Sequence, residues 1–119
     1  MSEPVSLDAL QEKVAGLPDE AFLMTVGEDG AVHVVSAAPR FDGPALVVAA
    51  GRLSRANAAA RPTVSLLWPR ADDRYCLIVD GTVIGADDAG LSIEPTKAIL
   101  HRLATADPSL PNCVPVQPA

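Results

Sequence analysis

The sequence predicts one small, mainly β domain, in which six short antiparallel strands form a closed or partly closed barrel with two or three short helices. Its 119 residues are enough for one hydrophobic core but not for two. Short apolar segments alternate with turn signals roughly every eight to twelve residues, a spacing typical of antiparallel barrels. No internal repeat or central linker divides the chain, so residues 1–119 are expected to form a single domain.

The N-terminal part predicts a helix followed by a β-hairpin. Apolar residues recur at helical spacing over residues 6–17, and Ser6 is a suitable N-cap. Residues 21–26 and 31–38 are rich in β-forming residues and enclose an Asp-Gly turn, so they predict two paired strands.

The middle of the chain predicts a strand, a helix and another strand. Residues 45–50 are almost wholly apolar, which predicts a third strand buried on both faces. Residues 54–61 are rich in alanine and predict a short helix with Ser54 as N-cap, closed by Pro62. Residues 63–68 then give the fourth strand.

The C-terminal part predicts two more strands and a third helix. Residues 75–84 form the fifth strand, and Asp80-Gly81 is expected to make a bulge that lets the sheet curl. Residues 91–93 form a brief sixth strand, and Pro95 is the first residue of the predicted helix. Repeated prolines predict that the tail, residues 104–119, is an extended strap or a disordered end.

Composition and residue spacing argue against several classes of protein. No apolar run is long enough to cross a membrane, and the N-terminus does not resemble a secretory signal, so a cytoplasmic location is expected. A net charge of −6 and 3% aromatic residues argue against nucleic-acid binding. Cys76 and Cys113 are interpreted as free thiols, and with His33 and His101 they lack the paired spacing of a metal site.

The segment from Gly51 to Asn57 is the best candidate for a binding site. Glycine permits close backbone approach, Ser54 and Asn57 offer hydrogen bonds, and the free N–H groups at a helix start favour an anion. Arg52 and Arg55 add charge-assisted contacts suited to a phosphate. The alternative interpretation is an ordinary strand-to-helix loop with an N-cap serine and two solvated arginines.

Several motifs in sequence order point to a known family. They are the hairpin sequence over residues 21–36, Phe-Asp-Gly at residues 41–43, a buried strand, and Asn57 five residues before Pro62. The chain from about residue 21 to residue 82 resembles the pyridoxamine 5′-phosphate oxidase-like family. These proteins are Greek-key split β-barrels that bind FMN or the deazaflavin F420.

The resemblance implies which residues hold the cofactor. The second strand would line the ring system and ribityl chain, and the loop with the following helix start would hold the phosphate. The residues at these positions are Val35, Ser36, Ala37, Arg52, Ser54, Arg55 and Asn57. The resemblance also implies a homodimer with the sites at the subunit interface.

One departure from the family pattern affects the choice of cofactor. The serine and lysine that the family often carries fall here at Arg52 and Ser54, so the usual lysine is missing. Arg52 or Arg55 could supply its charge; the alternatives are a pocket that holds F420, haem or nothing. The acidic composition slightly favours FMN, because F420 carries an anionic tail.

Two functions follow from the sequence. The first is an oxidoreductase whose bound flavin or deazaflavin passes a hydride to or from a small conjugated substrate; the absence of a catalytic motif fits this, since the cofactor supplies the chemistry. The second is a non-enzymatic dimeric barrel that binds a planar ligand or has lost its cofactor.

Overall fold

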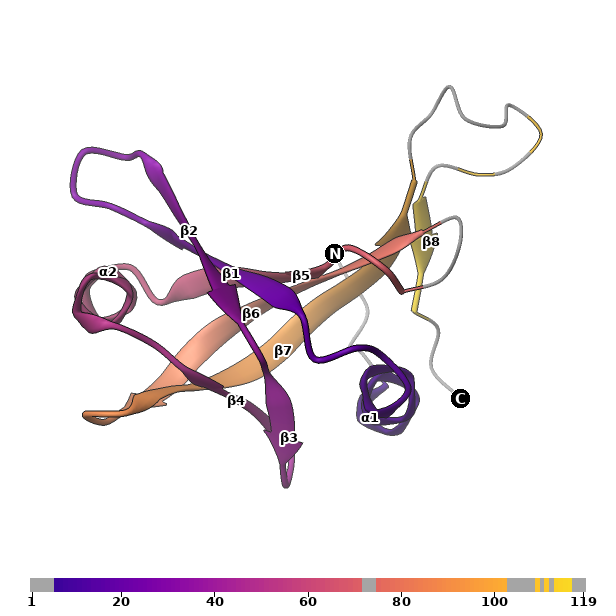
Figure 1. Ribbon diagram of the computed structural model, residues 1–119, viewed down its shortest axis with the longest axis horizontal. Helices are drawn as coiled ribbons and strands as arrows, with labels where there is room; N and C mark the ends of the chain where they lie inside the picture. The colour runs from indigo at the N-terminus through magenta and orange to yellow at the C-terminus, as the bar shows by residue number, and fades with distance from the viewer. Residues whose placement is uncertain (1–5, 72–74, 103–108, 110, 112, 117–119) are drawn as a thin grey trace.

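The computed structural model describes residues 6–71, 75–102, 109, 111 and 113–116, which form two helices and one antiparallel sheet (Figure 1). The helices are α1 (Leu7–Ala15) and α2 (Arg52–Ala60). The strands are β1 (Ala21–Val26), β2 (Val32–Ala37), β3 (Arg40–Asp42), β4 (Ala45–Ala49), β5 (Thr63–Trp68), β6 (Cys76–Ala86), β7 (Gly90–His101) and β8 (Cys113–Pro115).

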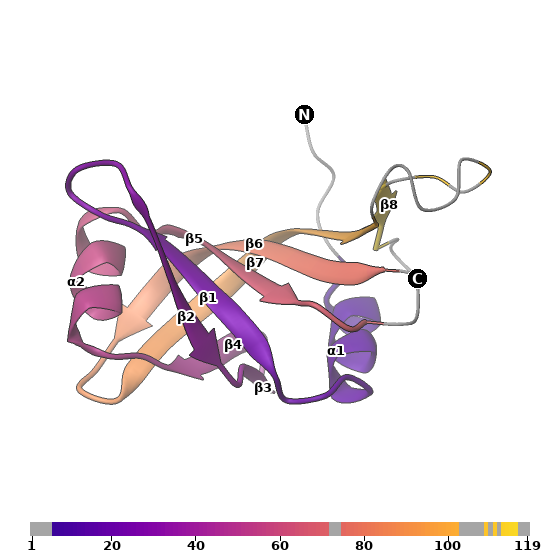
Figure 2. The ribbon, with the colours of Figure 1, turned by 45° about the horizontal axis from the view of Figure 1, so that its top comes forward.

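The sheet has the order β2-β1-β5-β6-β7-β4-β3, and β8 pairs with β7 beside this path. Strands β5, β6 and β7 form a meander, and β4 lies beside β7, which is a Greek-key order. The two outermost strands of the path, β2 and β3, are joined by only Ala38 and Pro39. The sheet therefore curls into a half-barrel in which β1 and β2 cross in front of β3 and β4 (Figure 2).

The core lies inside this curl. Every second residue of β1, β5 and the first half of β6 is buried, as expected for strands with one face on a core. Fully buried side chains include those of Leu23, Leu66, Trp68 and Leu77. These three strands lie where the sequence predicted strands.

A bulge bends the long β6–β7 hairpin at the predicted place. The register shifts between Asp80 and Gly81, where β7 carries one extra residue, and again between Val83 and Gly85. A Cβ atom on Gly81 would lie 2.5 Å from Ile93 Cγ2 and 2.7 Å from the Glu94 carbonyl oxygen. Only glycine allows this close approach, so Gly81 is needed for the curl of the sheet.

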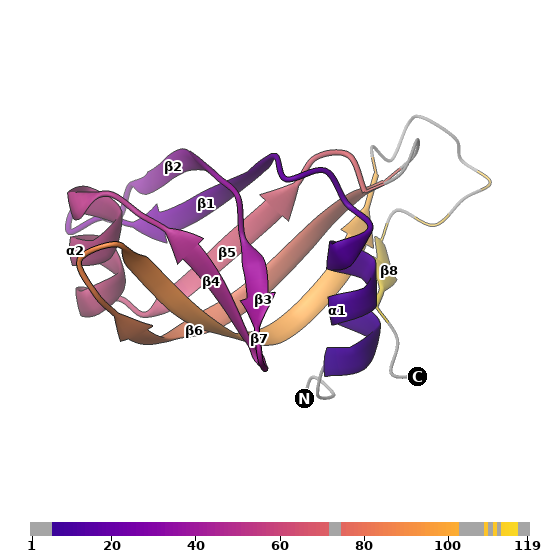
Figure 3. The ribbon, with the colours of Figure 1, turned by 60° about the horizontal axis from the view of Figure 1, so that its bottom comes forward.

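The two helices cover opposite ends of the half-barrel (Figure 3). The predicted N-terminal helix is confirmed: the Ser6 hydroxyl caps α1 by accepting from the Ala9 N–H at 3.4 Å, and Leu10 and Val14 are buried in the core. The predicted hairpin is confirmed as well, since β1 pairs with β2 and the Gly27 N–H donates to the Ala31 carbonyl at 2.8 Å.

The third predicted helix does not form. The residues from Pro95 onward continue β7, which pairs with β6 along most of its length. Pro95 is tolerated because it pairs with Gly81 at the bulge, one of the few places where a sheet accepts proline. The helical spacing of the apolar residues was therefore a wrong guide, because pairing with β6 decides the structure.

The residues that the structure describes form eight strands where six were predicted for the chain. The additional strands are β3, which includes Phe41 and Asp42 of the Phe-Asp-Gly motif, and β8 in the proline-rich tail. In β8, Cys113 pairs with His101 and Pro115 pairs with Ile99, so residues 113–115 adopt the extended alternative predicted for the tail. Residues 103–108, 110, 112 and 117–119 of the predicted helix and tail lie outside the described residues.

Helix α2 begins two residues earlier than predicted. Gly51 is the N-cap and makes no side-chain cap hydrogen bond, so Ser54 lies inside the helix and was wrongly predicted as the cap. Ser54 is only 2% exposed and faces the barrel. In the described part of the chain, neither helix has the length and apolar character needed to cross a membrane.

The outer face of the sheet is also rich in apolar residues. Across β2, β1, β5 and β6 it carries Phe22, Met24, Val34, Leu67 and Ile78, which are half-buried or exposed. The Val34 side chain is 53% exposed. An antiparallel sheet with a solvated outer face normally carries polar residues there, so this apolar face is unusual for a monomer.

Candidate functional site

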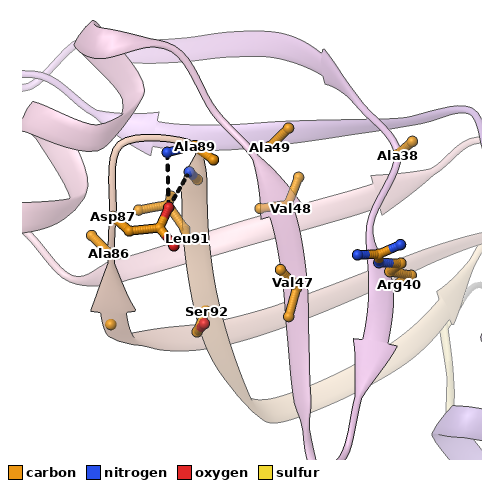
Figure 4. A pocket seen from close by; sticks show the side chains of 12 residues that line it. Ala38, Arg40, Val47, Val48, Ala49, Ala86, Asp87, Ala89, Leu91 and Ser92 are labelled. Atoms are coloured by element: carbon orange, nitrogen blue, oxygen red, sulfur yellow. Dashed lines mark hydrogen bonds between the residues drawn. The ribbon is translucent and has the colours of Figure 1, made fainter.

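A hollow of about 390 Å³ opens where β3 and β4 meet the turn between β6 and β7 (Figure 4). Its floor is built from small and apolar residues, whose short side chains leave room for a planar ring. Its lining residues are Ala38, Arg40, Val47, Val48, Ala49, Gly85, Ala86, Asp87, Ala89, Gly90, Leu91 and Ser92.

Close packing of two strands forms this floor. Gly90 pairs with Ala49, and a Cβ atom on Gly90 would collide with the Val48 carbonyl oxygen. Val47, on the same strand, is only half-buried and lines the hollow, so the prediction that residues 45–50 are buried on both faces was wrong.

Opposite charges lie on the two sides of the hollow. Arg40 extends from β3, and Asp87 lies on the β6–β7 turn (Figure 4). Among the described residues, the Arg40 guanidinium has no hydrogen-bond or ion-pair partner. A solvent-exposed arginine without an internal partner is available to bind an anion.

Asp87, in contrast, is already engaged by its own turn. Its Oδ1 accepts from the backbone N–H groups of Ala89 at 2.8 Å and Gly90 at 3.0 Å. These two hydrogen bonds, with a smaller contribution from Arg55, hold the pKa of the Asp87 carboxyl below its ordinary value despite opposing desolvation. The carboxylate therefore shapes this turn as a charged group.

The start of α2 adjoins this hollow, since Ala49 in its floor is two residues before the N-cap Gly51. The Arg55 guanidinium donates through Nε to the Gly51 carbonyl at 3.3 Å and through Nη1 to the Asp87 carbonyl at 3.4 Å. Arg52 is the first residue of α2, and it is exposed. Arg52 and Arg55 of the predicted binding segment therefore lie near the hollow, but they do not line it.

The remaining predicted site residues do not line this hollow and lie in different surroundings. On β2, Val35 and Ala37 turn inward and are half-buried against the core, whereas Ser36 turns outward and is exposed. Ser54 is buried in α2. Asn57 is 4% exposed, and its Nδ2 donates to the Thr25 hydroxyl at 3.1 Å.

A second, more open hollow of about 870 Å³ lies between α2 and the β1–β2 turn. Two of its charged side chains are held by the protein itself: Arg61 Nε donates to the Val26 carbonyl at 2.6 Å, and Asp29 Oδ1 accepts from the Ala31 N–H at 3.0 Å. Asn57 is the only predicted site residue in its lining, which also includes His33 and Leu53. The hydrogen bonds of Asn57 and Arg61 beside this hollow connect α2 to β1.

No family model matches the sequence. Two curated mycobacterial proteins do: "Uncharacterized protein Mb0449c" of Mycobacterium bovis (strain ATCC BAA-935 / AF2122/97) and "Uncharacterized protein MT0457" of Mycobacterium tuberculosis (strain CDC 1551 / Oshkosh). Each is 39% identical to this chain, and the match covers 82% of this chain and 82% of each relative. The chain belongs to the family of these two proteins.

A solved structure shows which fold this family member adopts. A chain described as an F420 reductase superimposes with a TM-score of 0.60 at 21% identity, covering 73% of this chain and 94% of its own. The chain therefore has the fold of that reductase, in keeping with the predicted mainly β barrel. At this identity the likeness concerns the fold alone.

Sequence reasoning did not find the hollow in this family member. Arg40 immediately precedes the Phe-Asp-Gly motif but belongs to no motif itself, and residues 85–92 carry no motif that sets them apart. These residues meet only because β4 pairs with β7. The one available sequence signal was Arg40 itself, a single basic residue between Pro39 and Phe41.

In the described part of the chain, no group of three or more His, Cys, Asp or Glu side chains is placed to hold a metal ion. Cys76 and Cys113 are free thiols, as predicted.

Proposed function

We propose that this chain is an oxidoreductase that binds a deazaflavin or flavin cofactor, with F420 favoured over FMN, in the hollow between β3, β4 and the β6–β7 turn. The observation that carries the proposal is Arg40, which has no partner within the described part of the chain, beside a floor of small apolar residues in a fold shared with an F420 reductase. FMN is the alternative cofactor.

The residues of the hollow fit such a cofactor in chemistry and in size. Alanines, glycines and valines leave room for a planar ring, and a volume of about 390 Å³ lies in the range of small-molecule sites. Arg40 and Arg52 would bind the phosphate or the acidic tail, and Arg55 would keep the helix start beside the turn. The cofactor, when bound, would supply hydride transfer to or from a small substrate.

We further propose that two copies of the chain form a homodimer through the apolar outer face of the sheet. The half-buried Phe22, Met24, Leu67 and Ile78 and the exposed Val34 form a surface that a second copy would cover. Light scattering should give twice the monomer mass for the native protein. Val34→Lys should lower that mass, whereas Glu12→Lys on exposed α1 should not.

The cofactor proposal is tested by titrating the purified protein with F420 and, separately, with FMN while following fluorescence. Saturable binding of one molecule per subunit is expected for F420, with weaker binding of FMN. The bound, reduced cofactor would then be mixed with small conjugated substrates and its reoxidation followed by absorbance. If the folded protein binds neither cofactor, the non-enzymatic barrel is the better description.

A further inference from the structure

Two cysteines and a histidine lie in one row across three neighbouring strands. Cys76 on β6 pairs with His101 on β7, and His101 pairs with Cys113 on β8. Directly paired residues in antiparallel strands project from the same face, so the three side chains share one face of the sheet. This row lies at the end of the molecule away from α2 and the first hollow (Figures 1 and 3).

Several hydrogen bonds hold β8 in this position. The Tyr75 hydroxyl and Arg102 Nε both donate to the Pro111 carbonyl, at 3.1 Å and 3.0 Å. On the other side of β8, the Val116 N–H donates to the Ala98 carbonyl at 3.0 Å. Cys113 is therefore held in place from both directions along the chain.

The two thiols have different partners. The Sγ atom of Cys113 lies 3.2 Å from His101 Nδ1, and Cys113 is exposed. Cys76 is half-buried, and its Sγ atom donates to the His101 carbonyl at 3.3 Å. A carbonyl oxygen can accept this hydrogen bond but does not act as a base for a thiol, whereas an imidazole nitrogen can take the proton of Cys113.

We propose that Cys113 is a thiol-exchange site for low-molecular-weight disulfides, with His101 as its base. His101 Nδ1 takes the proton of Cys113, and the thiolate attacks one sulfur of the disulfide. The S–S bond of the small disulfide breaks as a new S–S bond forms to Cys113. The leaving thiolate takes the proton from His101, so Cys113 is oxidised while half of the small disulfide is reduced.

The product is a mixed disulfide that Cys76 does not resolve. Cys76 and Cys113 lie two strands apart with β7 between them, a Cα separation of about 9.5 Å by strand spacing. A disulfide requires Cα atoms closer than about 7 Å. The modification on Cys113 therefore stays until an external thiol removes it.

The test uses the full chain with Cys76→Ser, which leaves Cys113 as the one thiol. Its reaction with 4,4′-dithiodipyridine at pH 7 is followed by absorbance and compared with that of N-acetylcysteine amide. Cys113 is expected to react about tenfold faster than the small thiol, because His101 Nδ1 lies beside its Sγ atom and can take the proton as the sulfur attacks. The matched variant Cys113→Ser, which retains Cys76, is expected to react slower than the small thiol.

A second variant tests the histidine. Cys76→Ser with His101→Gln should lose the about tenfold advantage while retaining the circular dichroism spectrum of the fold. Oxidised glutathione should add one glutathionyl group to Cys76→Ser by mass spectrometry. The proposal is overturned if folded Cys76→Ser reacts no faster than N-acetylcysteine amide, a result that does not depend on whether the His101 variant folds.

Discussion

The two hollows on either side of α2 differ in what their polar groups already do. In the hollow between α2 and the β1–β2 turn, Asn57, Arg61 and Asp29 are bound to neighbouring protein atoms. In the hollow beside β3 and β4, Arg40 has no partner among the described residues. The arginine and the asparagine of the larger hollow are thus used within the protein, whereas the smaller hollow has a guanidinium available for an anionic ligand.

The largest expected effect comes from the floor of the smaller hollow. Gly90→Ala should lower the free energy of unfolding by about 2–4 kcal/mol, because the new Cβ atom collides with the Val48 carbonyl between paired strands. Urea unfolding measures the loss. Gly85→Ala is the matched control: its Cβ atom would meet only Ser92 Cβ at 3.8 Å, so a change below about 1 kcal/mol is expected.

The comparison of the hollows is tested directly by a pair of variants. Arg40→Ala should weaken F420 binding by about tenfold to a hundredfold, since a charge-assisted hydrogen bond is lost. His33→Ala in the other hollow should leave the affinity unchanged, and Arg70→Ala controls for the loss of one positive charge. Fluorescence titration gives each Kd. Weaker binding in the His33 variant alone would place the ligand in the larger hollow.

A smaller effect is expected at the joint between α2 and β1. Asn57→Ala should lower the free energy of unfolding by about 1–2 kcal/mol, because the buried Thr25 hydroxyl loses its 3.1 Å partner. A double-mutant cycle with Thr25→Val, read by urea unfolding, should show a coupling of about 1 kcal/mol. A coupling near zero would mean that this hydrogen bond does not stabilise the joint.

The smallest effect concerns Asp87 and pH. Its folded pKa is lowered, so its stabilising contribution is present above the ordinary value of about 4 and is lost as the pH falls through the folded value. The stability difference between the native chain and Asp87→Asn should therefore shrink on acidification from about pH 5. Urea unfolding at a series of pH values measures it. A difference that stays constant over this range would contradict the assignment.

Local patterns were enough to predict the elements that local interactions decide. The Ser6 cap, the turn before Ala31 and the bulge at Gly81 each have a short-range cause, and all three were predicted correctly. The second half of β7 and all of β8 have no such cause, because partner strands decide their structure. Helical spacing gave the wrong prediction for β7, and the prolines of the tail left the choice between an extended and a disordered segment open.

The candidate site was only partly within reach of the sequence. The helix start with Arg52 and Arg55 lies beside the hollow, as one continuous segment can show. Arg40 and Asp87 are distant in the sequence and meet through the pairing of β4 with β7. The inward or outward direction of Ser36 depends on strand register, which a sequence with apolar residues on both faces of β2 does not specify.

The long β6–β7 hairpin has a consequence for the order in which the chain folds. Its strands are neighbours in sequence, joined by a turn closed by the Asp87 N–H to the Gly90 carbonyl at 3.1 Å, so little loop entropy opposes their pairing. The pairing of Leu46 with Ile93 must instead close a much longer loop. The hairpin is thus expected in the transition state and β4 only afterwards, giving higher φ-values at Leu77 than at Leu46.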